Sequence, residues 1–262
     1  MKFVRLATIA ALTSTIFAGG ITAFAEEVRN VTTDGTIGFT PNEDEELVVV
    51  PPVEEPGVEI EPEVPGTTGP LSIMKAVTMD FGSQVISNQD RTYNMVAEKQ
   101  QKKGTTGEEN KVPYVSFAQV QDVRGTNAGW NLQVRMTDFK ATNTTNDTLL
   151  GAEISLLDPR IQYEGSTPGN APVAHPAGMK LIPNASAVSV MTAEKDKGAG
   201  VSSVVWGNQA DLDAQEANDE VEVVTNDAIQ LFIPGSTAKD ATQYKSTLTW
   251  ELSNTPDVSG VN

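Results

Sequence analysis

Apolar and polar residues alternate over short runs in the greater part of the chain, and turn-forming residues separate the runs. The clearest run covers residues 130–136, where Trp130 and Leu132 share one face with other apolar residues and polar residues occupy the opposite face. Residues 244–252 repeat this pattern near the C-terminus. Because a β-strand places successive side chains on opposite faces, both runs predict strands with one apolar and one polar face.

Further strands are expected at residues 73–81, 114–122, 152–157, 187–191, 201–206 and 229–233. About eight short strands with turns between them predict an all-β domain, a β-sandwich of Ig-like or related type. The domain is expected to cover residues 71–262. Helical periodicity is confined to residues 211–219, which are expected to form one short exposed helix or loop.

The first residues carry an export signal. Lys2 and Arg5 precede an apolar stretch, and residues 23–25 (Ala-Phe-Ala) offer small side chains at positions −3 and −1 of a cleavage site. This order is typical of a secretory signal peptide. We therefore expect residues 1–25 to be removed by cleavage after Ala25.

Residues 26–70 differ from the rest of the chain because they are rich in Glu and Pro. Proline interrupts helices and central strands, and like charges repel one another, so that such a chain stays extended. This segment is expected to be a disordered acidic spacer. A short apolar run at residues 47–50 could alternatively add to the edge of a sheet.

Composition excludes several classes of protein. The chain has no Cys and a single His, His175, which rules out Cys–His catalysis, thiolate metal sites and His-rich metal sites. No nucleophile elbow or phosphate-binding glycine loop occurs either. A pair of catalytic carboxylates is invisible in sequence, but no motif indicates one. We expect no enzyme activity and no cofactor.

The acidic balance of the chain bears on its partners. A formal net charge of −17 argues against nucleic acid and against anionic lipid surfaces as ligands. One acidic segment, residues 211–222, has the ligand type of a hard-cation loop but lacks the Gly and Glu positions of an EF-hand. A solvated acidic loop is therefore expected there, and no metal site.

Two Trp-x-Leu tripeptides stand in longer sequence blocks. The first block contains Asp122, Arg124, Gly129 and Trp130-Asn131-Leu132, and the second contains Tyr244, Leu248, Trp250-Glu251-Leu252 and Pro256. In order and spacing these blocks resemble the two sequence blocks of the WxL-domain surface proteins of low-GC Gram-positive bacteria. The resemblance extends over roughly residues 71–256, and Phe81-Gly82-Ser83-Gln84 resembles the opening of that domain.

The resemblance implies a function by attachment. It suggests a secreted protein that is held on the cell surface by non-covalent association with the cell wall, with peptidoglycan as the ligand. It also suggests other WxL proteins and a membrane-anchored protein with a DUF916-type domain as partners. The alternative is therefore a subunit of a surface complex that is held by such a partner and not by the wall itself. The absence of an LPxTG-like sorting motif agrees with non-covalent attachment.

The chemistry of the motif leaves two interpretations open. The alternation favours burial of the Trp–Leu faces in the core, whereas indole rings at a surface can stack on sugar rings. Asp122 and Arg124 could bind charged groups of the wall or form a structural salt bridge. Trp206 is expected in the core. The candidate wall- or partner-binding residues are Trp130, Leu132, Trp250, Leu252, Tyr244, Asp122 and Arg124.

Overall fold

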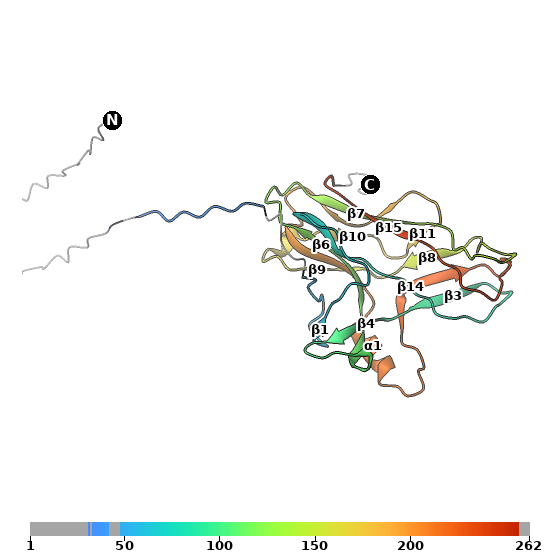
Figure 1. Ribbon diagram of the computed structural model, residues 1–262. Coiled ribbons are helices and arrows are strands. Elements are labelled where there is room, and N and C mark those ends of the chain that lie inside the picture. Colours follow the sequence, from blue (N-terminus) through green and yellow to red (C-terminus); the bar gives the residue numbers. More distant parts are fainter. Residues whose placement is uncertain (1–30, 32, 42–47, 257–262) are drawn as a thin grey trace, which may run out of the picture. The chain divides into compact units, whose positions relative to one another are not determined.

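The computed structural model describes residues 31, 33–41 and 48–256 (Figure 1). The chain divides into two compact units, Met1–Gly38 and Phe39–Asn262. The described residues of the first unit contain no helix or strand. The expected signal peptide and its cleavage after Ala25 lie outside the described residues, as do residues 26–30, 32 and 42–47 of the expected spacer.

Nearly all regular secondary structure in the described part of the second unit is β-strand, and all paired strands are antiparallel. The all-β prediction is thereby confirmed. The strands are β1 (Val58–Glu59), β2 (Leu71–Lys75), β3 (Arg91–Val96), β4 (Glu98–Lys102), β5 (Lys111–Tyr114), β6 (Ser116–Asp122), β7 (Trp130–Met136), β8 (Glu153–Leu156), β9 (Arg160–Tyr163), β10 (Val173–Ala174), β11 (Met179–Leu181), β12 (Val188–Ala193), β13 (Gly200–Trp206), β14 (Thr225–Ile233) and β15 (Leu248–Ser253). The helices are α1 (Gln209–Glu216) and the short 3-10 turns η1 (Glu108–Asn110) and η2 (Pro168–Asn170).

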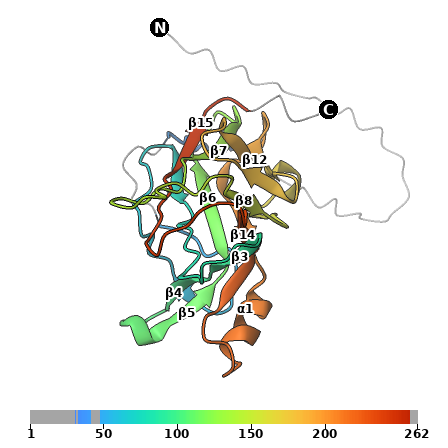
Figure 2. The same cartoon turned by 90° about the vertical axis from the view of Figure 1, so that its right-hand side faces the viewer.

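These strands form four small sheets (Figures 1 and 2). Their orders are β1-β4-β5, β2-β6-β13-β9, β10-β12-β7-β15 and β11-β8-β14-β3. The expected β-sandwich of about eight strands needs correction here, because the strands are divided among four sheets and not between two clearly facing ones. Several additional strands, such as β1, β10 and β11, have only two or three residues. An alternating pattern cannot be recognised over so short a run.

The sheet β2-β6-β13-β9 separates two hydrophobic cores. All residues of β6 are buried, and they alternate between the cores: Ala118 and Val120 belong to the principal core, and Phe117 belongs to the second. In β13, Trp206 packs in the principal core, whereas Val205 faces the second. The expected core position of Trp206 is confirmed, and β6 is covered on both faces.

Residues 48–70 pack against this domain, which corrects the expected disordered spacer for that part of the chain. Val49 and Val58 are buried in the second core. The backbone of Val50 is bonded on both sides by the Gln119 side chain: Val50 N donates to Oε1 (2.9 Å), and Nε2 donates to Val50 O (2.7 Å). The Tyr114 hydroxyl bonds both backbone groups of Val53 in the same way. These side chains satisfy backbone groups in a segment that prolines keep out of regular structure.

Helix α1 overlaps residues 211–219, where a short exposed helix or loop was expected, but it begins and ends earlier, at Gln209 and Glu216. Asn208 caps its N-terminus by accepting a hydrogen bond from Ala210 N (3.0 Å). The helix is not exposed all round, because Leu212 and Gln209 are buried against the second core. No helix in the described part of the chain is long and apolar enough to cross a membrane.

Candidate functional site

The two Trp-x-Leu motifs lie side by side in one sheet. β7 carries the first motif and pairs with β15, which carries the second, so that Leu132 stands opposite Leu252 and Trp250 opposite Val134. Trp130 comes two residues before Leu132 on the same face. The two indoles therefore lie on either side of the Leu132–Leu252 pair, and the fold brings together segments that are far apart in the chain.

This shared face is turned toward the principal core. Trp130 and Leu132 are 0% exposed, whereas Trp250 and Leu252 are half-buried and pack against the core from the end strand of the sheet. The interpretation that the motif builds the core is confirmed for Trp130. A ligand could reach Trp250 and Leu252 from outside, but it could contact Trp130 and Leu132 only if the fold opened.

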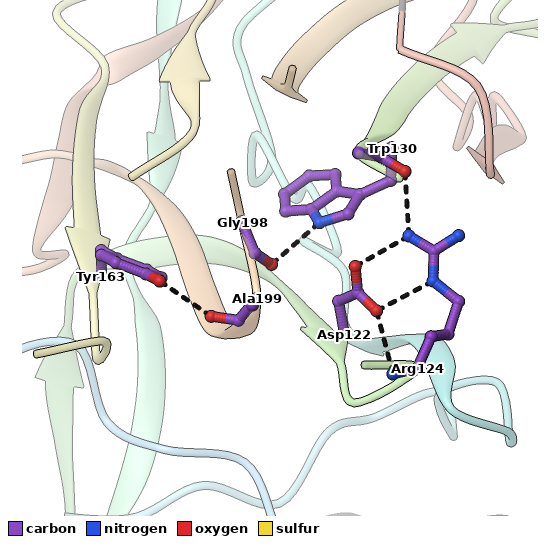
Figure 3. A network of polar contacts seen from close by, with 7 residues as sticks. Asp122, Arg124, Trp130, Tyr163, Gly198 and Ala199 are labelled. Atoms are coloured by element: carbon purple, nitrogen blue, oxygen red, sulfur yellow. Dashed lines mark hydrogen bonds and ion pairs between the residues drawn. The ribbon is translucent and has the colours of Figure 1, made fainter. Parts of the chain in front are cut away.

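The indole of Trp130 is fixed by a turn between β12 and β13 (Figure 3). Its Nε1 donates a hydrogen bond to Gly198 O (3.0 Å), and the next carbonyl, Ala199 O, accepts one from the Tyr163 hydroxyl (2.9 Å). Gly198 has a φ of +73°, and a Cβ there would lie 2.7 Å from Trp130 Nε1. Only glycine fits at this position. Sequence reasoning missed Gly198, because no motif or periodicity marks it.

Asp122 and Arg124 form a bidentate ion pair directly before the first motif (Figure 3). Arg124 Nε donates to Asp122 Oδ1 (2.8 Å), and Nη2 donates both to Asp122 Oδ2 (2.7 Å) and to Gly129 O (2.9 Å). The hydrogen bonds to Asp122 raise the pKa of Arg124. The side chains of Asp122 and Arg124 are only 2% and 15% exposed. The pair thus ties the end of β6 to the start of β7 and holds the loop that leads into Trp130.

Gly129 of the first sequence block lies close to Pro256 of the second, and its replacement by Ala is expected to lower the free energy of unfolding. Gly129 has a φ of +79°, and a Cβ there would lie 2.5 Å from Ala193 O and 2.7 Å from Pro256 Cγ. Gly125 in the same loop has a φ of +70° but no atom within 4 Å of its Cβ position. The strain of a left-handed residue alone costs about 1–2 kcal/mol.

We therefore expect Gly125→Ala to lose about that much free energy of unfolding and Gly129→Ala to lose clearly more. Denaturant-induced unfolding of the two variants measures the difference. Equal losses would show that Ala193 and Pro256 can make room for the added Cβ, and that their close approach to Gly129 does not matter for stability.

Tyr244 acts as a clip ahead of β15. Its hydroxyl donates to Asn146 O (2.6 Å) and accepts from Asp240 N (2.9 Å). The Asp240 carboxylate in turn accepts hydrogen bonds from the backbone N–H groups of Thr145 (3.0 Å) and Asn146 (2.9 Å) and from the Thr144 hydroxyl. The half-buried Tyr244 ring packs against the principal core. The Tyr244 hydroxyl therefore has both its partners within the fold. It joins the loop that contains Asn146 to the loop that contains Asp240.

The hydrogen bonds to the Asp240 carboxylate are expected to make part of the folding stability sensitive to acid. The hydrogen bonds from Thr144 and Asn146 lower the pKa of Asp240 from 3.8 to about 2. Between these values the unfolded chain takes up a proton that the folded chain does not, so the contribution of Asp240 is complete above pH ~4 and is lost as the pH falls toward ~2.

Thermal unfolding between about pH 5 and about pH 2 should therefore show a flatter pH dependence for Asp240→Asn than for the parent chain. The matched control is Asp219→Asn at an exposed position. If both variants followed the pH dependence of the parent chain, the hydrogen bonds to Asp240 would not contribute to the free energy of unfolding.

His175 and one carboxylate of the acidic segment have partners within the fold. His175 is buried and stacks on Trp206, and its Nε2 accepts a hydrogen bond from Trp206 Nε1 (2.9 Å). Burial lowers the pKa of His175. In the acidic segment around α1, Asp213 accepts a hydrogen bond from Gln209 (2.8 Å). Among the described residues, no group of three or more His, Cys, Asp or Glu side chains is placed to hold a metal ion.

Comparison with known proteins identifies a family. The sequence profile of the family described as "WxL domain surface cell wall-binding" matches residues 26–256, which include both strands that carry the Trp-x-Leu motifs. Neither the curated proteins nor the solved structures contain a match. This is a family of wall-binding domains and not of enzymes, and its match supports association with the cell wall at the cell surface. Because the match covers most of its length, the chain belongs to the WxL-domain family of surface cell wall-binding proteins.

Proposed function

We propose that this protein is secreted and attaches non-covalently to the cell wall by binding peptidoglycan. The observation that carries the proposal is the family match over the domain in which the two motif strands pair side by side. The net charge of −17 adds a constraint, because it repels the anionic polymers of a Gram-positive wall. Attachment must therefore rest on hydrogen bonds and shape, for which the sugar hydroxyls and amides of peptidoglycan offer partners.

In this proposal the motif residues have different parts. Trp130 and Leu132 shape the sheet from within, and the Asp122–Arg124 pair holds the loop before them. Trp250, Leu252 and Tyr244 are half-buried, so that they are more accessible from outside than Trp130 and Leu132. Loss of any of these residues would affect attachment, either through the fold or through contact.

The test is co-sedimentation of the full chain with purified sacculi from which anionic polymers have been stripped. We expect retention on these bare sacculi. Retention should also persist as salt is raised from about 0.1 M to 1 M, because salt screens charges but leaves hydrogen bonds and stacking in place. A chain that stays entirely in the supernatant would refute peptidoglycan binding.

A second candidate function is that of a subunit in a surface complex, held by a membrane-anchored partner of the DUF916 type that the resemblance suggests. The observation in its favour is that β15 ends its sheet and, among the described residues, no strand pairs with its outer edge. The free N–H and C=O groups of such an edge can pair with a strand of another protein. This function predicts retention on whole cells, loss after protease treatment of those cells, and no retention on bare sacculi.

A further inference from the structure

The polar face of the sheet β10-β12-β7-β15 is the face turned away from the principal core. Of the two middle residues of the Trp-x-Leu motifs, Glu251 is exposed on this face, whereas Asn131 is only 3% exposed. Because the Trp and Leu side chains point to the core, the middle residues of the motifs, Asn131 and Glu251, point the opposite way. The strand register sets them among further polar side chains. The uncharged members of this polar face are Asn131, Gln133, Ser189, Thr192, Thr249 and Ser253.

Hydrogen bonds between neighbouring strands fix the side chains of the polar face. Asn131 Nδ2 donates to Ser189 Oγ (2.9 Å), and Asn131 Oδ1 accepts from the Thr192 hydroxyl (2.8 Å). Gln133 Nε2 also donates to Ser189 Oγ (3.3 Å). An amide has two N–H donors and an oxygen with two lone pairs, so these bonds orient both amides and use only part of their capacity. The half-buried Gln133 can offer the rest to a ligand, whereas the buried Asn131 holds its neighbours in place. Such a surface needs little reordering to accept further hydrogen bonds.

The polar face is also electrically neutral. The only charged side chains among the strand residues of this sheet are Arg135 and Glu251. They pair with each other, with Arg135 Nη2 at 3.1 Å and Nε at 3.2 Å from Glu251 Oε1. A neutral sheet of amides and hydroxyls therefore lies on a chain whose net charge is −17. This face is suited to an uncharged polar ligand, whereas the charge of the whole chain repels anionic polymers.

We propose that the polar face is the surface that contacts the wall, and that its ligand is the glycan strand of peptidoglycan, bound through uncharged hydroxyl and acetamido groups. This inference rests on the proposed function and assigns it a place on the molecule. It gives the two faces of the motif strands different roles. The Trp and Leu side chains anchor β7 and β15 to the core, and the accessible residues of the opposite face, such as Gln133, Thr249 and Ser253, meet the ligand.

The test places two negative charges on the polar face and, in a matched control, on another sheet. The variant is Gln133→Glu with Thr249→Glu, on neighbouring strands β7 and β15. The control is Gln230→Glu with Thr92→Glu on β14 and β3, where Gln230 also donates to a side chain of the neighbouring strand (Asn94 Oδ1, 3.1 Å). In each pair, the Thr lies on the neighbouring strand, two residues away from the residue that stands opposite the Gln. The two variants therefore add the same number of charges at equivalent positions of their sheets.

Binding to bare, polymer-stripped sacculi is measured by co-sedimentation, and folding by circular dichroism. We expect the polar-face variant to bind at least about tenfold more weakly than the parent chain, and the control to bind like the parent. A neutral variant, Gln133→Met with Thr249→Val, keeps the shape of the strands and removes two hydrogen-bonding groups. It is expected to lose binding by a similar factor, and it replaces the charged variant if that variant does not fold.

Two outcomes overturn this inference in different ways. If the parent chain binds sacculi and both polar-face variants bind equally well while folded, the polar face is not the contact surface, and the proposed function stands without it. If the parent chain itself does not bind bare sacculi, the proposed function fails, and the glycan assignment fails with it.

Discussion

Replacing Trp130 with Ala is expected to lower the free energy of unfolding by about 3–5 kcal/mol, the range found for large aromatic residues in cores. Trp130 has no exposed surface, and the substitution would leave a cavity between β7 and the principal core. It would also leave Gly198 O without the hydrogen bond that the indole donates. Both effects act in the same direction.

Trp250→Ala is the matched comparison. Trp250 occupies the same position of the second motif but is half-buried on the end strand β15, so that its removal is expected to cost only about 1–2 kcal/mol. Trp130→Phe separates the two contributions at Trp130, because it keeps most of the apolar area and removes the hydrogen bond to Gly198. Its expected loss is about 1–3 kcal/mol.

Urea unfolding followed by circular dichroism measures all three variants. If Trp250→Ala were as destabilising as Trp130→Ala, the difference in burial between the two Trp side chains would not determine their contributions to the free energy of unfolding. A binding assay alone could not replace this measurement, since an unfolded Trp130→Ala chain would lose wall attachment whatever its contact surface.

Local alternation predicted the strands that have one buried and one polar face. β7 begins and ends where the pattern of residues 130–136 places it. The second motif strand starts later than expected, at Leu248 and not at Tyr244. The reason is the Tyr244 hydroxyl, which bonds to Asn146 and to the backbone of Asp240, so that the chain before β15 follows a loop. Contacts of this kind join distant segments and leave no local pattern.

The second hydrophobic core could not be predicted from local sequence patterns, for a related reason. β6 contains Gln119 among its buried residues, and a buried glutamine in an apolar run indicates no particular partner. In the structure its amide bonds the backbone of Val50, in the segment that was expected to be a disordered spacer. The acidic Pro-rich composition described the average of residues 26–70. It did not show that single valines such as Val49 and Val58 would be buried.

The sequence predicted which residues belong to the candidate site, but it did not predict how their side chains are arranged. The spacing of the sequence blocks pointed to two related strands, which β7 and β15 form. It could not decide whether Asp122 and Arg124 face a ligand or each other, because residues two apart at the end of a strand can do either. The structure shows them paired. Gly198 escaped notice because its role depends on a backbone angle and on an indole far away in the sequence.

The Asp122–Arg124 pair makes the second large prediction. Arg124→Ala would leave the Asp122 carboxylate, whose side chain is 2% exposed, without its cation. Removal of one partner of a buried ion pair costs about 3–5 kcal/mol, because the remaining charge is uncompensated. Gly129 O would lose a hydrogen bond at the same time. We expect Arg124→Ala to be comparable to Trp130→Ala in urea unfolding.

The surface pair Arg135–Glu251 provides the control, since its side chains are 47% and 48% exposed. Glu251→Ala is expected to cost at most about 1 kcal/mol, the usual value for an exposed ion pair. Arg124→Lys keeps the charge but not the planar fork that meets both Asp122 oxygens, and it should fall between Arg124→Ala and the parent chain. The double variant Asp122→Ala with Arg124→Ala should lose less than the two single variants together, because neither charge is then left alone. If Arg124→Ala instead cost no more than Glu251→Ala, the loop before Trp130 would be held by other contacts, and the pair at the end of β6 would again be available to a ligand.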